Sequence, residues 1–182
     1  MLKKLGNYGL FLLSESFLSL GLGLFTPFLY IFLQDFGGSP EQFGFSIGIL
    51  LLAAGITSYF AGKHSDRIGR KIFLVVGGLV LSGTVFAYTI ITSLVQLYVL
   101  QIINGIVSSI QLTAGTSFLG DITKKATRGK DVGKYHALIQ IMAAIAIMLG
   151  GVIVGQLGFK IIFYIAGIIM FVSTLFLLYI KE

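Results

Sequence analysis

Away from the ends of its apolar segments, the chain carries one acidic or basic side chain, Glu15. In the hydrocarbon of a membrane a carboxylate costs about 3 kcal/mol or more unless it faces water, meets a partner or takes up a proton. Glu15 is therefore a candidate for binding a cationic solute, or for carrying a proton as a cavity changes sides. The alternative is a carboxylate near the membrane surface, solvated by water or bonded to Ser14, Ser16 or Ser19.

Two polar helix faces accompany Glu15. Side chains that recur at three- and four-residue steps share one face of a helix. In the segment of Glu15 this face consists of Glu15, Ser19, Gly23, Thr26 and Tyr30. In a later segment it consists of Gln101, Asn104, Ser108 and Gln111, and Gln140 of a third segment can join them. These faces predict a weakly charged cavity for a small solute, neutral or cationic rather than anionic.

Other chemistries lack the residues that they need. The sequence has no cysteine, no phosphate-binding glycine loop with lysine, and no histidine pair at zinc spacing. His64 and His136 have no ligand partners nearby in sequence, so we expect no metal site and no cofactor. Neither an arginine-rich voltage helix nor a selectivity-filter segment is present. We therefore expect neither an enzyme nor a channel.

The elements that must position these side chains are membrane helices. Hydrophobic residues make up 56% of the 182 residues and charged residues 11%, and the mean hydropathy is +0.97. The length allows about thirty residues for each of six units, enough for a spanning helix and a connection. We predict one domain over residues 1–182, an all-α membrane protein with spanning helices at about 10–33, 43–61, 72–91, 94–119, 135–157 and 161–180. Pro27 is expected to kink the first helix, and no cleavable signal peptide is evident.

The net charge of +6 indicates topology rather than binding to nucleic acid. With both termini inside, 12 of the 13 basic residues fall on the inner side and only Lys160 falls outside. Short inner loops of membrane proteins carry such an excess of lysine and arginine. We therefore predict a multi-pass protein of the inner (plasma) membrane, with the lipid bilayer as its surroundings and both termini cytoplasmic.

The ten residues Gly62 to Lys71, GKHSDRIGRK, lie between two apolar runs and are expected to form a basic loop. Gly62 can end the incoming helix, and Gly69 permits a turn that residues with a side chain resist. This loop resembles the signature between helices two and three of the major facilitator superfamily, which implies one six-helix half of that fold, built of two three-helix repeats and drug-efflux-like. By this resemblance Gly62, Asp66, Arg67, Gly69, Arg70 and Asp121 form a gating motif. The alternative is a static ion pair.

Further positions match the family and others depart from it. Leu97-Tyr98-x-x-Gln101-x-x-Asn104-Gly105 is similar to the family's second motif, in which arginine occupies the place of Gln101. Gly150, Gly151 and Gly155 fall where drug antiporters carry a glycine-proline motif, but no proline is present. These departures mean that proton coupling would have to depend on Glu15, or be absent.

A single half implies a second one. In twelve-helix members the halves are parallel repeats, so two copies inserted in one orientation can rebuild the architecture as a homodimer. Gly44 and Gly48, and Gly151 and Gly155, have the four-residue spacing that lets helices approach closely, across the interface or within one protomer. We predict a homodimeric secondary transporter of a small molecule by alternating access. Two alternatives are a non-transporting subunit that needs a different six-helix partner, and one half of a longer protein.

Overall fold

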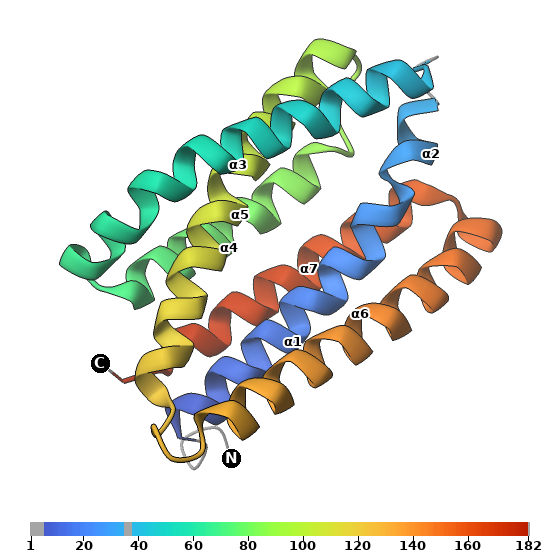
Figure 1. Cartoon of the computed structure of the whole chain (residues 1–182). Helices are drawn as coiled ribbons and strands as arrows, with labels where there is room; N and C mark the ends of the chain where they lie inside the picture. The colour runs from blue at the N-terminus through green and yellow to red at the C-terminus, as the bar shows by residue number, and fades with distance from the viewer. Residues whose placement is uncertain (1–5, 35–37, 182) are drawn as a thin grey trace.

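The computed structural model describes residues 6–34 and 38–181, apart from the side chains of Lys63, His64 and Asp66. Figure 1 shows a bundle of long helices. In chain order the elements are α1 (Asn7–Phe25), the short 3-10 helix η2 (Thr26–Phe28), α2 (Leu29–Gln34), α3 (Pro40–Ile68), α4 (Arg70–Ala87), α5 (Leu94–Ile122), α6 (Arg128–Leu157) and α7 (Phe159–Leu178).

Within the described residues, six helical units are long and apolar enough to cross a membrane. The first of them is broken, since α1, η2 and α2 together form one span over residues 7–34. Pro27 lies in η2, where its missing N–H interrupts the α-helical ladder. The described part of the chain contains helices and no strands. The predicted class, an all-α membrane protein with six spanning helices, is confirmed.

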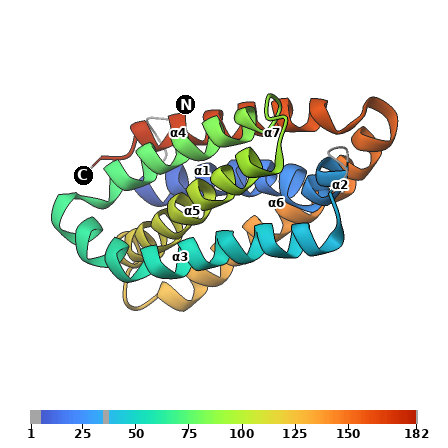
Figure 2. The same cartoon turned by 90° about the horizontal axis from the view of Figure 1, so that it is seen from above.

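The helices pack as two similar sets of three. The first span packs against α6 and α7 through α1, and α5 packs against α3 and α4. The two sets correspond helix by helix: the first span corresponds to α5, α3 to α6, and α4 to α7. The two sets contact each other through α4 and α7. Figure 2 shows α4 and α7 along one side of the bundle, α3 along the opposite side, and α1 and α5 between them. This arrangement is that of a three-plus-three repeat.

Glycines permit the closest crossings in both sets. A Cβ on Gly23 of α1 would lie 2.8 Å from the carbonyl oxygen of Ala143 in α6, and one on Gly105 of α5 would lie 2.2 Å from that of Leu50 in α3. Because neither backbone can give way cheaply, these two positions accept only glycine. They bring α6 against α1 and α3 against α5, one crossing in each repeat.

Aromatic rings fill the bundle toward the end where α2 leads to α3. The ring of Phe25 lies 5.0 Å from that of Tyr88 and 5.3 Å from that of Phe163, and Phe32 lies 5.1 Å from Phe163. Edge-to-face arrangements of this kind add to the hydrophobic gain from burial. We call this group, which also includes Phe159, the aromatic cluster. It closes the interior at one end.

The opposite end, which we call the basic end, holds Gly69, the connection 123–127 and the last turn of α7. Here the prediction of a ten-residue loop is wrong. Helix α3 continues to Ile68 and α4 begins at Arg70, so the connection is Gly69 alone. Gly62 does not end a helix, because it lies inside α3 and no helix-breaking residue follows it before Gly69. Gly69 makes the turn with φ 107° and ψ 132°, a conformation that favours glycine.

Other element ends differ by a few residues from the prediction. The fifth span was predicted from residue 135, but α6 starts at Arg128 and runs without a break to Leu157. At the other end of the bundle Ser39 caps α3. Its hydroxyl oxygen accepts a hydrogen bond from the backbone N–H of Gln42 at 3.4 Å, and its own backbone N–H donates to Oε1 of Gln42 at 3.0 Å. Ser93 caps α5 through the N–H of Gln96.

Candidate functional site

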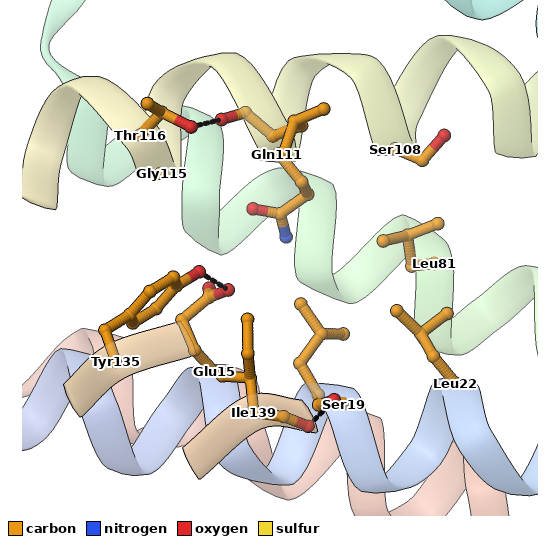
Figure 3. Close-up of a pocket in the computed structure, with 12 residues that line it drawn as sticks. Glu15, Ser19, Leu22, Leu81, Ser108, Gln111, Gly115, Thr116, Tyr135 and Ile139 are labelled. Atoms are coloured by element: carbon orange, nitrogen blue, oxygen red, sulfur yellow. Dashed lines mark hydrogen bonds between the residues drawn. The ribbon is translucent and has the colours of Figure 1, made fainter. Parts of the chain in front are cut away.

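A cavity of about 330 Å³ opens between α1, α4, α5 and α6. Figure 3 shows Glu15 and Ser19 rising from α1 toward Ser108 and Gln111 of α5. These four residues were predicted to form a polar cavity, and the structure brings them together. The rest of the lining is Leu18, Leu22, Leu81, Leu112, Gly115, Thr116, Tyr135 and Ile139.

The carboxylate of Glu15 is held by one donor in the described structure. The hydroxyl of Tyr135, in the second turn of α6, donates to Oε2 of Glu15 at 3.1 Å. No base among the described residues pairs with Glu15. The ring of Tyr135 stacks on Phe11 with centroids 5.8 Å apart, which fixes the direction of its hydroxyl. An acidic group is thus placed in a cavity with one neutral donor and without a neutralising cation.

Neighbouring polar groups are mostly engaged by backbone carbonyls. The hydroxyl of Ser19 donates to the carbonyl oxygen of Ile139 at 2.7 Å, and that of Thr116 to Leu112 at 2.7 Å. The amide nitrogen of Gln111 donates to the carbonyl oxygen of Leu74 in α4 at 2.9 Å. Such bonds hold α1 to α6 and α5 to α4 around the cavity.

Gln101 and Asn104, which were predicted to lie on the same polar face, are not among the residues that line this cavity. The hydroxyl of Tyr88 donates to Oε1 of Gln101 at 3.0 Å and accepts from Nδ2 of Asn104 at 2.9 Å. The hydroxyl of Thr84 donates to Oδ1 of Asn104 at 2.6 Å, and Nε2 of Gln101 reaches Ser46 at 3.4 Å. Both amides are on the same face of α5 as Ser108 and Gln111, but the aromatic cluster covers that face at its own end of the bundle.

The remaining predicted polar residues lie outside the cavity lining. Thr26 is exposed in η2, and the ring of Tyr30 packs edge-on against Phe43 at 5.1 Å. Gln140 is exposed on α6. Gly23 lies on the predicted face, but it serves the crossing with α6 described above.

Tyr135 and Thr116 are the functional residues that sequence reasoning missed. Tyr135 stands at the start of the predicted fifth helix, among lysines, where nothing in its spacing points to Glu15. Only the packing of α6 on α1 brings them together. Thr116 could not be found by periodicity either, because it lies five residues after Gln111, a step that leaves the polar face of α5.

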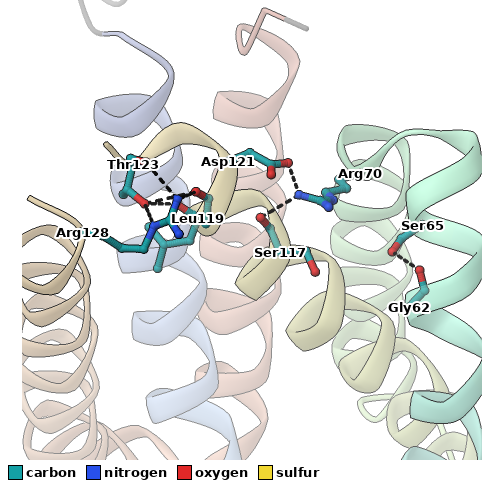
Figure 4. Close-up of polar contacts among 9 residues, drawn as sticks. Gly62, Ser65, Arg70, Ser117, Leu119, Asp121, Thr123 and Arg128 are labelled. Carbon is teal, nitrogen blue, oxygen red and sulfur yellow. Dashed lines mark hydrogen bonds and ion pairs between the residues drawn. The ribbon is translucent and has the colours of Figure 1, made fainter. Parts of the chain in front are cut away.

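At the basic end, two arginines converge on the last turns of α5 (Figure 4). Arg70, the first residue of α4, pairs with the carboxylate of Asp121 and donates to the carbonyl oxygen of Ser117 at 2.7 Å. Arg128, the first residue of α6, donates to the carbonyl oxygen of Gly120 at 2.8 Å. Cations are favoured at this end of a helix. Arg67 is exposed, and the side chain of Asp66 lies outside the described part of the structure.

The glycines predicted for close helix contact have open space beside them in the part of the chain that the structure describes. A Cβ added to Gly44, Gly48, Gly151 or Gly155 would have no atom of another part of the described structure within 4 Å. By contrast, a Cβ on Gly150 would lie 2.6 Å from the ring of Phe28. Among the described residues, these four glycines therefore do not lie at a close helix crossing. No three histidine, aspartate or glutamate side chains come together within the described residues in a way that could hold a metal ion.

Comparisons with known proteins agree with this architecture. A family model described as Major Facilitator Superfamily matches residues 11–182. The chain is 30% identical over 155 residues to the uncharacterized MFS-type transporter YitZ of Bacillus subtilis, which covers 85% of this chain and 94% of that protein. It is 30% identical over 164 residues to multidrug resistance protein 2 of the same organism, covering 90% of this chain and 41% of that protein. It is 24% identical over 163 residues to quinolone resistance protein NorA of Staphylococcus aureus, covering 88% and 42%. The chain therefore spans nearly all of one relative and about two fifths of the other two.

Proposed function

Because the chain belongs to the major facilitator superfamily, a family of membrane transporters and not of enzymes, we propose that it moves a small solute across the plasma membrane by alternating access, as a homodimer. The observation that carries the proposal is Glu15 in the cavity, held by Tyr135 and facing no base of the described structure. A carboxylate in this setting is stabilised by a cationic solute or by a proton. Glu15 is therefore the group on which binding or coupling depends.

Exposed helix faces support a second copy beside the first. Figure 1 shows α3 and α6 at opposite edges of the bundle. Their apolar side chains are largely uncovered: Leu52 is 68% exposed, Tyr59 82% and Met148 73%. A twofold axis along the membrane normal would place α3 of one copy against α6 of the other. Gly44 and Gly48 would then meet Gly151 and Gly155 of the partner copy at the same depth, because both pairs lie at the end away from the basic end.

The relatives fit this arrangement. Almost the whole length of YitZ matches this six-helix chain, so a protein of one half's length exists among them. Multidrug resistance protein 2 and NorA each match over about two fifths of their length. The names of these two proteins place them in drug resistance, which favours amphipathic solutes for this chain too. The excess of basic residues at one end favours both termini on the cytoplasmic side.

The contact of Arg70 with Asp121 is proposed as part of a gate at the basic end. Arg70 joins the start of α4 to the last turns of α5, and Gly69 is the single residue between α3 and α4. A movement of α3 against its neighbours would act directly on this ion pair. Asp66 and Arg67, at the end of α3, complete the proposed gating motif together with Gly62, Gly69, Arg70 and Asp121.

The proposal is tested by replacing Glu15→Gln, which keeps the size of the side chain and removes its charge. In proteoliposomes with an imposed pH gradient, uptake of neutral and cationic amphipathic probes is measured for the parent protein and the variant. We expect gradient-driven uptake of the probes that the parent moves to be abolished, with an unchanged melting temperature. The control is Glu41→Gln, at the exposed start of α3 on the far end of the bundle. Uptake by Glu15→Gln equal to that of the parent would remove Glu15 from the mechanism.

A further inference from the structure

We propose that the amide oxygen of Gln111 makes the cavity selective for solutes that carry an N–H donor, such as a protonated primary or secondary amine. This inference rests on the proposed function, because it names the solute class of the same cavity. Gln111 is 7% exposed and lines the cavity from α5. Its Oε1 is one of two buried side-chain atoms, within the described structure, that have no hydrogen-bond partner.

The orientation of this amide is determined by its neighbours. The carbonyl oxygen of Leu74 can only accept a hydrogen bond, so the NH₂ group of Gln111 must face it, and does so at 2.9 Å. The oxygen is then turned to the other side. In Figure 3 the amide of Gln111 extends from α5 into the space that Glu15 and Tyr135 approach from below.

Glycine in α4 holds the side chain in this place. A Cβ on Gly77 would lie 3.0 Å from Cγ and 3.1 Å from Cδ of Gln111. The glutamine therefore lies in a notch of α4 that exists because position 77 has no side chain. An acceptor that is fixed in this way loses little freedom when it binds a donor, which makes it suited to recognition.

Two acceptors of different kind thus belong to the lining of one cavity, and that of Gln111 is buried in its wall. Glu15 supplies a negative charge, which attracts any cation, and Gln111 supplies a neutral acceptor, which is satisfied only by a donor hydrogen. A protonated amine offers both a charge and N–H groups, whereas a quaternary ammonium of similar shape offers the charge alone. Because a buried acceptor without a partner is costly, the amine should bind about tenfold more tightly than its quaternary analogue.

The test uses dansylcadaverine, a primary amine, and its trimethylammonium analogue as probes for the intact protein in liposomes. Dissociation constants are measured from dansyl fluorescence, and their ratio is the readout. We expect a ratio of about ten for the parent and a ratio near one for Gln111→Met, through weaker binding of the amine alone. Ser109→Ala is the matched control, since Ser109 holds the other unpartnered buried atom but does not line the cavity. Its ratio should equal that of the parent.

The outcomes separate this inference from the proposed function. Glu15→Gln should weaken both probes together and leave their ratio unchanged, so the role of Glu15 can fail while that of Gln111 stands. A ratio that is the same in Gln111→Met and the parent would mean that the amide oxygen meets only water, and would overturn the inference. A parent ratio near one, or a parent that binds neither probe, would overturn it too. Should Gln111→Met not fold, Gly77→Ala displaces the same amide and must lower the ratio.

Discussion

Tyr135 joins α6 to Glu15 through a single hydroxyl, and this bond is the strongest candidate for coupling solute binding to helix movement. Glu15 stands on α1, whereas Tyr135 stands where α6 leaves the basic end. Any movement of the first turns of α6 against α1 therefore changes the surroundings of the carboxylate. When the hydroxyl moves away, Glu15 loses its donor in the described structure and gains affinity for a cation or a proton.

Removing that hydroxyl by Tyr135→Phe should impair transport without harming the fold. The new ring can keep the stacking contact with Phe11, while the carboxylate loses a hydrogen bond of the charged kind, for which we expect about a tenfold change in initial uptake rate. Uptake of an identified solute and the melting temperature are both measured in the same preparation. Tyr164→Phe, on the exposed side of α7, is the control. Unchanged uptake by Tyr135→Phe would show that the hydroxyl takes no part in transport.

At this scale the sequence predicts a good part of the candidate site, for physical reasons that apply to some residues and not others. Glu15 could be identified because a charge in an apolar helix is costly, and Gln111 because it repeats at helical spacing. Gln101 has the same spacing, but its exposure depends on the rings of Tyr88 and the aromatic cluster, which the period of one helix does not contain. Tyr135 could not be found, since its role comes from a contact 120 residues away along the chain.

At the scale of elements, Gly62 and Gly69 belong to one sequence motif but have different structural roles, since only Gly69 forms the connection between α3 and α4. Gly69 has φ 107°, and an alanine there is strained, by about 1–3 kcal/mol. Gly62 is helical, and a Cβ there would make an ordinary contact at 3.6 Å with Thr113. We expect Gly69→Ala to lower the melting temperature in detergent by several degrees, and Gly62→Ala to leave it unchanged or slightly raised. Equal melting temperatures of the two variants would contradict this assignment of the turn.

The end of α3 also shows why helix ends were harder to predict than helix identity. Six apolar runs predict six spans, and no soluble alternative fits that composition. The residues from 63 to 67 are polar, which indicates that the chain has left the membrane but not that the helix has ended. A helix continues into water as long as no residue breaks it, and here that residue is Gly69.

The ion pair of Arg70 and Asp121 gives a prediction in which stability and transport diverge. The two side chains are 24% and 59% exposed, and exposed pairs contribute less than about 1 kcal/mol to stability. Asp121→Asn should therefore melt close to the parent protein, yet change the uptake rate severalfold if the pair belongs to a gate. Asp131→Asn removes another acid at the same end and serves as the control. Parent-like uptake by Asp121→Asn would leave a static ion pair as the correct reading.

For the whole molecule, the open glycines on α3 and α6 predict where two copies meet. Gly48→Leu combined with Gly151→Leu would place side chains where a close helix contact is proposed, so we expect the variant to purify as single chains. Gly83→Leu is the matched control. Gly83 is equally free of neighbours, but it lies on α4, which is not part of the proposed interface between α3 and α6. Loss of association in both variants alike would remove the proposed interface.

The measurement that tests the central claim most directly is the mass of the intact particle in a lipid disc, with no other protein supplied. The proposed homodimer consists of two six-helix chains, so we predict the mass of two chains. A particle of one chain, in preparations that still take up solute, would contradict the homodimer. One chain associated with an unrelated six-helix protein would contradict it as well, and would identify the partner that completes the transporter.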